Sequence, residues 1–141
     1  MRKILLILSS FTFYLNADLK ASLDQELKTL MPKVIEWRHD IHQYPELGNR
    51  EFRTSNKVKT HLENLGIKVE SGIAYTGLVG LIEGGKPGPT IALRADMDAL
   101  PVEEKTGLPY ASKVRTTYLG NDVGVMHACC LLYTSPSPRD A

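Results

Sequence analysis

The chain reads TIALRADMDALP at residues 90–101, and this stretch decides the fold that we predict. Residues 90–95 are mostly apolar and follow a turn rich in glycine and proline, which predicts a buried strand. Asp96 and Asp98 come next, and carboxylates two residues apart project to the same side of an extended chain. Because ligands of open α/β sheets bind beyond the carboxyl ends of strands, the pair is a candidate site. A solvated loop is the alternative, since Asp is common in loops.

The residues before this stretch predict two helices. Between residues 19 and 41, apolar side chains recur at steps of three and four, which is one face of an amphipathic helix. Pro32 is expected to kink that helix or split it, and Pro45 is expected to end it. A second helix is predicted over residues 53–65, with Gly66 as its stop signal.

The second helix and the strands after it define the expected fold class. Val58, Leu62 and Leu65 mark the buried face of that helix. Short strands are predicted over residues 67–69 and 77–82, ahead of the strand described first. Helices followed by strands predict an α/β fold in which helices pack on a mixed sheet.

The composition excludes two classes of partner. The 141 residues include 17 Lys and Arg against 16 Asp and Glu, which gives a net charge of +1. A chain this close to neutral has no strong electrostatic attraction to nucleic acid or to an anionic membrane. Its length is that of a single domain, and it is long enough to bury a core.

Residues 1–17 are predicted to be a cleaved signal peptide. Arg2 and Lys3 form a basic start, residues 4–15 form a short apolar run, and Ala17 is a suitable residue before the cut. The run is shorter than the ~20 apolar residues that span a bilayer, so no stable membrane span is expected. A buried first helix and an uncleaved anchor are the alternatives. Cleavage predicts a periplasmic or secreted protein.

The end of the chain combines a candidate metal ligand with a foreign-looking tail. Residues 124–129 read GVMHAC, and the thiolate of Cys129 is a metal ligand or, alternatively, a small buried thiol. Residues 130–140 read CLLYTSPSPRD, the translation of a DNA string that resembles the transposon-end adapter of some sequencing libraries. We therefore expect residues 130–141 to be an adapter-derived, disordered tail. A genuine Ser- and Pro-rich tail is the alternative.

Other polar side chains are weaker candidates. His39 and His42 lie near the end of the first predicted helix, where structural hydrogen bonds or a substrate-side role are expected ahead of metal binding. Glu103 and Glu104 could be catalytic carboxylates, but a pair of glutamates in a loop is usually solvated, and this is what we expect of them.

Five segments, taken together, resemble one family. They read RHDIHQYPELG at 38–48, TGLVG at 76–80, RADMDALPVEE at 94–104, LPYAS at 108–112 and VMHAC at 125–129. In this order and spacing they resemble the metal-dependent amidohydrolases of the aminoacylase/carboxypeptidase superfamily. The most similar branch contains hippurate hydrolases, N-acyl-amino-acid amidohydrolases and plant auxin-conjugate hydrolases. The resemblance runs from about residue 34 to residue 129.

The resemblance implies a fold and a length. Residues 18–129 match the N-terminal part of a zinc-peptidase-like α/β catalytic domain, so the chain is expected to be truncated. In the family a smaller lid and dimerisation domain is inserted later in the chain, which implies that the intact protein can form a homo-oligomer. The general-base glutamate of the family lies beyond the end of this chain.

The resemblance also implies site residues. Cys129 matches a ligand of a divalent metal pair, whose metals are Zn, Mn, Co or Ni, and Asp98 matches a carboxylate that supports the metal site. Asp96 stands where related branches place a histidine ligand. Leu131 occupies the position of a ligand histidine and cannot coordinate, so the site is expected to be incomplete. His42 and Glu46 are the substrate-side candidates.

The function that follows is metal-assisted hydrolysis. The substrates implied are N-acyl amino acids, of the hippurate or N-acetyl kind, or the C-terminal residues of peptides. The 141-residue chain alone is expected to be inactive. Two alternatives stay open: a truncated, non-catalytic remnant with a binding role, which Leu131 and the absent base favour, and a secreted α/β domain with an unrelated binding role.

Overall fold

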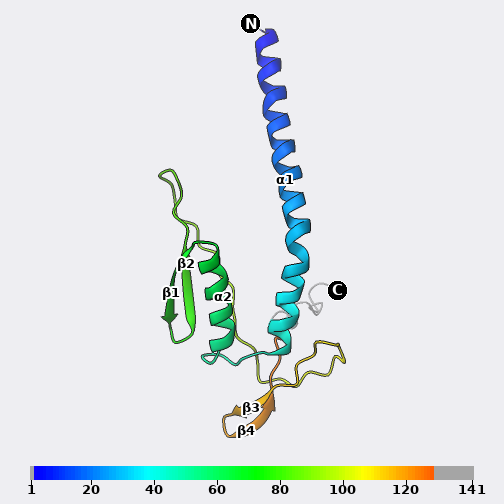
Figure 1. Cartoon of the computed structure of the whole chain (residues 1–141), viewed down its shortest axis with the longest axis vertical. Coiled ribbons are helices and arrows are strands. Elements are labelled where there is room, and N and C mark those ends of the chain that lie inside the picture. The colour runs from blue at the N-terminus through cyan, green and yellow to red at the C-terminus, as the bar shows by residue number, and fades with distance from the viewer. Residues whose placement is uncertain (1, 129–141) are drawn as a thin grey trace, which may run out of the picture. The chain divides into compact units, whose positions relative to one another are not determined.

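The computed structural model describes residues 2–128, and for residues 2–18 it describes the backbone only. Within these residues the elements are α1 (Arg2–Gln43), α2 (Phe52–Asn64), β1 (Lys68–Ile73), β2 (Gly77–Leu81), β3 (Arg115–Tyr118) and β4 (Asn121–Gly124) (Figure 1). The chain divides into two compact units, one ending at His39 and the other beginning at Asp40. The candidate site lies in the second unit.

Helix α1 continues through Pro32, so of the two outcomes predicted for this residue, a kink or a split, the split is wrong. A proline removes one backbone hydrogen bond from a helix, and the backbone hydrogen bonds of the turns on either side can keep the helix continuous. The turn that follows is supported by Lys33, whose Nζ lies 2.9 Å from Glu36 Oε2 and 5.8 Å from the centre of the Trp37 ring. The predicted end before Pro45 is confirmed, because the helix stops at Gln43.

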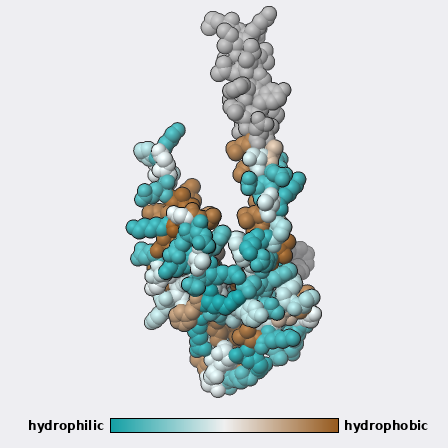
Figure 2. Space-filling view, viewed as in Figure 1, coloured by the Kyte–Doolittle hydropathy of each residue, from teal (hydrophilic) through white to brown (hydrophobic). Residues whose placement is uncertain are grey.

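The first unit presents an apolar face to solvent. Figure 2 shows hydrophobic residues along the surface of α1, and they include Leu19, Leu23, Leu27 and Leu30, each about half exposed. Even so, no helix between residues 2 and 128 is both long enough and apolar enough to cross a membrane. Cleavage at Ala17 is untested and stays a prediction.

Helix α2 packs on the β1–β2 hairpin. The helix ends at Asn64, and Gly66, with φ +75°, follows shortly after it as the predicted stop signal. A Cβ added at Gly80 would lie 3.2 Å from Leu62 Cδ1, so the strand approaches the helix closely. Leu62 is half-buried by this packing, but Leu65 is 62% exposed, so its predicted burial is wrong. Leu65 lies just after the last residue of the helix, Asn64, so its side chain is not on the helix face that packs against β2.

The predicted strand over residues 90–95 does not form in the described chain, where Ile91 is 82% exposed and Leu93 is 97% exposed. An isolated extended segment has neither ladder hydrogen bonds nor a covered face, so nothing within residues 2–128 stabilises it as a strand. The described residues instead hold two separate two-stranded antiparallel sheets, β1–β2 and β3–β4.

Sequence reasoning missed the β3–β4 hairpin. Its register pairs Tyr118 with Asn121, so Leu119 and Gly120 form a two-residue turn with φ values of +50° and +80°. Positive φ at both turn positions is typical of a type I′ turn, which matches the twist of a hairpin. The signal was weak because leucine is an unusual residue for the first of these positions.

Two isolated bridges build the small core of the second unit. Leu47 pairs in parallel with Ala99, and Leu100 pairs in an antiparallel manner with Met126. Leu47, Ala99 and Val125 are buried together. The bridges therefore place residues 98–100 between two other segments of the chain.

Candidate functional site

Backbone hydrogen bonds hold the centre of the candidate site together. The N–H of Ala99 donates to the carbonyl of Glu46 at 2.8 Å. Leu100 and Met126 exchange two bonds, at 2.9 and 3.1 Å. Three segments that are far apart in the sequence therefore meet here. They carry Glu46, Asp98 and His127, which either make these bonds or adjoin residues that do.

His127 presents a buried nitrogen to this cluster. Its Nε2 has no hydrogen-bond partner in the described part of the chain. Burial lowers the pKa of His127, and the nearby His42 lowers it further, against opposing effects from Asp98 and Glu46. A hydrogen bond to the Asp98 backbone is among these opposing effects, and since Nε2 is unpartnered this bond belongs to Nδ1. The burial and the hydrogen bond at Nδ1 therefore favour the neutral imidazole with a lone pair at Nε2.

The two predicted carboxylates, Asp98 and Asp96, have different partners in the structure. Asp98 lies beside Gly48, where an added Cβ would be 3.9 Å from Asp98 Oδ2. Asp96 instead accepts from the Arg94 guanidinium, with Nη2 at 2.9 Å from Oδ1, and both side chains are largely exposed. Asp98 therefore joins His127, while Asp96 forms a surface ion pair.

Glu46 has a clear structural contact. Its two oxygens accept the backbone N–H groups of Arg53 at 2.9 Å and Thr54 at 2.8 Å, at the start of α2. The residue at the N-cap position, Glu51, makes no such side-chain bond and instead accepts the Thr76 hydroxyl. A carboxylate on the free N–H groups of a helix N-terminus stabilises the helix. The predicted substrate-side role of Glu46 is untested.

His42 and Glu104 form a pair between the end of α1 and a loop. Nε2 of His42 lies 3.0 Å from both oxygens of Glu104, whose side chain is 0% exposed. The expectation that Glu104 is solvated is therefore wrong, while it is confirmed for its neighbour Glu103, whose side chain is 63% exposed. The difference arises because the loop turns only one of the two glutamates toward α1. The structural hydrogen bond expected of His42 is confirmed.

Hydrogen bonding keeps the buried Glu104 ionised. Burial alone would raise the pKa of Glu104, but bonds from the Thr106 hydroxyl, His42 and the Ser112 backbone outweigh it and lower the pKa. The short bonds from Thr106 Oγ1, at 2.5 Å, and Ser112 N, at 2.6 Å, account for this direction. No sequence pattern distinguished Glu104 from Glu103 as the buried acid.

Part of the predicted metal site lies outside the described residues. Cys129, Leu131 and the expected tail at 130–141 fall there. Within residues 2–128, no group of three or more His, Cys, Asp or Glu side chains could hold a metal ion. The unpartnered Nε2 of His127 and the carboxylate of Asp98 nevertheless suit the edge of such a site, because both are acceptors and His127 comes two residues before Cys129 in the sequence.

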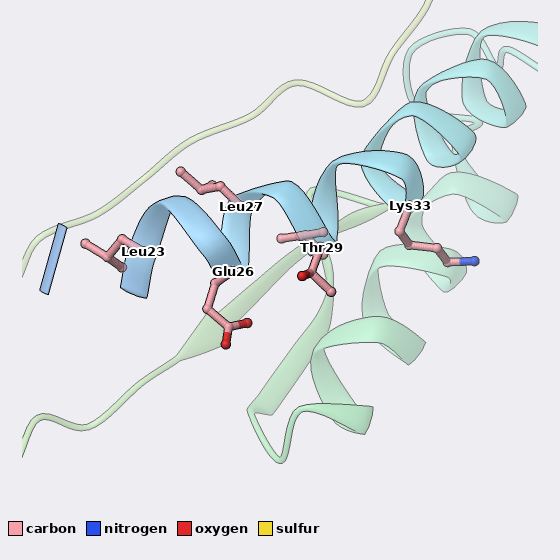
Figure 3. Close-up of a pocket in the computed structure, with 6 residues that line it drawn as sticks. Leu23, Glu26, Leu27, Thr29 and Lys33 are labelled. Atoms are coloured by element: carbon pink, nitrogen blue, oxygen red, sulfur yellow. The ribbon is translucent and has the colours of Figure 1, made fainter. Parts of the chain in front are cut away.

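A hollow along α1 is a poorer candidate for a functional site than this cluster. It is lined by Leu23, Glu26, Leu27, Thr29, Leu30 and Lys33, all from one helix. Figure 3 shows Leu23 and Leu27 projecting from one side of the ribbon, with the Glu26 carboxylate pointing elsewhere. These side chains do not converge on a point where a reacting group could be held.

Comparisons with known proteins identify the relatives of the chain. No protein-family model matches it. The thermostable carboxypeptidase 1 of Saccharolobus solfataricus is 48% identical over 113 residues, covering 79% of this chain and 27% of that protein. The N-acetyl-L-cysteine deacetylase of Bacillus subtilis is 48% identical over 103 residues, covering 73% and 23%. The chain thus spans about a quarter of the length of the curated relatives it matches.

A solved structure agrees with these matches. The YXEP protein of Bacillus subtilis, a dinuclear metal-binding peptidase of the M20 family, is 41% identical, with a TM-score of 0.62 over 72% of this chain and 27% of that one. The class that these matches define is that of the metal-dependent amidohydrolases and peptidases. The chain belongs to the M20 family within that class, and the expected α/β fold class is confirmed.

Proposed function

We propose that the product of the source gene is an exported, metal-dependent amidohydrolase. Its substrates are N-acyl amino acids of the hippurate or N-acetyl kind, or the C-terminal residues of peptides. The observation that carries this proposal is the 48% identity to a carboxypeptidase, over 113 residues, and to an N-acetyl-L-cysteine deacetylase, over 103 residues. The names of both proteins, a carboxypeptidase and a deacetylase of an N-acetyl amino acid, denote cleavage of an amide bond.

The residues of this chain have separable roles in the proposed reaction. Cys129 would hold the metal as a thiolate, and Asp98 would orient a ligand or a bound water. His127 would accept a hydrogen bond at Nε2, because its other nitrogen is already engaged. A bound pair of divalent ions, Zn, Mn, Co or Ni, lowers the pKa of water and polarises the amide carbonyl.

The proposed location follows from the leader at residues 1–17. If the leader is cleaved after Ala17, the mature exported protein begins at Asp18. N-terminal sequencing of the protein recovered from the periplasm or medium tests this. Recovery only from the cytoplasm with residues 1–17 intact would contradict export.

A second candidate is a non-catalytic remnant with a binding role. The presence of Leu131 where the family has a ligand histidine favours it, because a leucine side chain offers no donor to a metal. Resequencing the source gene across the codons for residues 129–131 separates the two candidates. A read that gives the ligand histidine at position 131 supports the enzyme, and a confirmed Leu131 supports the remnant.

The enzyme proposal is tested by assaying the purified gene product on hippurate and on N-acetyl amino acids. We expect turnover that a chelator abolishes and added divalent metal restores. Asp98→Asn should lower kcat/KM by about 10-fold or more, as loss of an outer metal-site carboxylate does. Asp122→Asn, which changes an exposed carboxylate on β4, is the control and should retain activity. Turnover that persists in chelator would reject the metal-dependent mechanism.

A further inference from the structure

Glu104 is a buried carboxylate with no role in the hydrolysis described above. Its side chain is 0% exposed. Its oxygens accept from three separate parts of the chain: His42 Nε2 at 3.0 Å, Thr106 Oγ1 at 2.5 Å and the Ser112 N–H at 2.6 Å. These bonds fix the position of the carboxylate, because moving it would break contacts to the helix end and to two points of the loop at once.

The carboxylate also determines which nitrogen of His42 carries a proton. An ionised carboxylate can only accept hydrogen bonds, so Nε2 of His42 must donate. A neutral imidazole with its proton on Nε2 keeps its lone pair on Nδ1. The Tyr110 ring meets the imidazole edge to face, with centroids 5.9 Å apart and planes at 80°, which limits rotation of the His42 ring.

His42 is close enough to the candidate site to influence it. His42 lies within electrostatic range of His127. Asp98 and Glu46 also act on His127, so His42 lies beside the same cluster. The His42 side chain is 17% exposed, so a ligand can still reach the ring.

We propose that Glu104 is a positioning residue that holds His42 in one orientation and as the Nε2–H tautomer. Nδ1 of His42 is then a hydrogen-bond acceptor for the N–H of an amide substrate or of the amine that leaves it. This role rests on the proposed amidohydrolase function, whereas the tautomer itself does not. Glu103 offers a matched comparison, since it is the neighbouring glutamate and is exposed.

The tautomer is tested by nuclear magnetic resonance on the gene product labelled with ¹⁵N in its histidine rings. His42→Gln identifies the His42 signals by their loss. We expect the Nε2–H pattern at His42 in the native protein and in Glu103→Gln, and a loss of that single pattern in Glu104→Gln. If Glu104→Gln does not fold, Glu104→Asp, which retracts the carboxylate by one methylene, should give the same change. An Nδ1–H pattern or a mixture of tautomers in the native protein would overturn the proposal.

Kinetics separate this proposal from the function on which it rests. Glu104→Gln should lower kcat/KM for an N-acyl amino acid by about 10-fold, the lower end of outer-shell effects, while Glu103→Gln leaves it unchanged. Full activity in a folded Glu104→Gln variant would reject the positioning role and leave the hydrolase proposal intact. An inactive native protein that shows the expected tautomer would reject the hydrolase proposal and the contact of His42 with substrate. It would leave intact the proposal that Glu104 fixes the orientation and tautomer of His42.

Discussion

At the scale of single residues, Asp40 joins the end of α1 to α2. Its carboxylate accepts from Arg53 Nη2 at 2.6 and 2.8 Å and from Lys57 Nζ at 2.5 Å. Burial alone would raise the pKa of Asp40, but the hydrogen bonds from Lys57 and Arg53 outweigh it, so the pKa is lowered. The Arg53 guanidinium also lies 4.9 Å from the centre of the Tyr44 ring. The cluster is thus stabilised by an ionised Asp40.

This lowered pKa predicts a dependence of stability on pH. The unfolded chain binds a proton at Asp40 near pH 3.8, and the folded chain binds it only at lower pH. The contribution is therefore complete above pH 3.8 and is lost as the pH falls through the folded value. Glu104, lowered from 4.5, acts in the same direction. Urea unfolding of the gene product should give a smaller free energy of unfolding at pH 3 than at pH 6.

Variants assign part of this effect to Asp40. Asp40→Asn should reduce the loss of stability between pH 6 and pH 3, because the neutral amide has no proton to gain in this range. Asp24→Asn, at an exposed position in α1, is the control. If the two variants show the same pH dependence, the Asp40 cluster does not contribute.

At the scale of elements, the start of α2 depends on a residue outside the helix. The first N–H groups of a helix have no partner within it. The carboxylate of Glu46 satisfies two of them, at Arg53 and Thr54, while its backbone carbonyl accepts from Ala99. One residue therefore links α2 to the segment that carries Asp98.

This capping predicts that Glu46→Ala destabilises the fold by about 0.5–2 kcal/mol, the usual loss for a helix N-terminal cap. Glu63→Ala, in the last turn of the same helix, is the control, and it should cost little because a negative charge there is unfavourable to the helix dipole. Chemical unfolding measures both. Unchanged stability together with a raised KM would show instead that Glu46 acts on the substrate side.

At the scale of the whole molecule, the described chain leaves much apolar surface uncovered. Leu23 and Leu27 of α1 are 53% and 55% exposed, and Ile91 and Leu93 of the predicted strand are almost fully exposed. The buried apolar core holds few residues, centred on Leu47, Ala99 and Val125. Folding stability depends on burying apolar surface, so this small core alone gives the chain little stability.

The isolated 141-residue chain is therefore predicted to fold poorly. It should bind the dye ANS strongly, give weak near-UV circular dichroism and unfold over a broad temperature range. It should also show no hydrolysis of N-acyl amino acids. A sharp cooperative transition with a native-like near-UV spectrum would contradict this prediction.

Local patterns were sufficient to predict several elements and the family. Periodicity and stop signals predicted α2 and β1–β2, and Pro45 marked the end of α1, because these depend on neighbouring residues alone. Five motifs in order predicted the family of the relatives, while the metal-site role that they imply for Asp98 stays a prediction.

The tertiary structure decided which polar groups meet. Glu103 and Glu104 are adjacent and chemically identical, yet only Glu104 is buried against His42. Asp98 meets His127 only because Leu100 pairs with Met126. The apolar run at 90–95 predicts a strand that has no partner within residues 2–128. Burial, pairing and pKa depend on contacts between distant segments, and local sequence patterns do not specify those contacts.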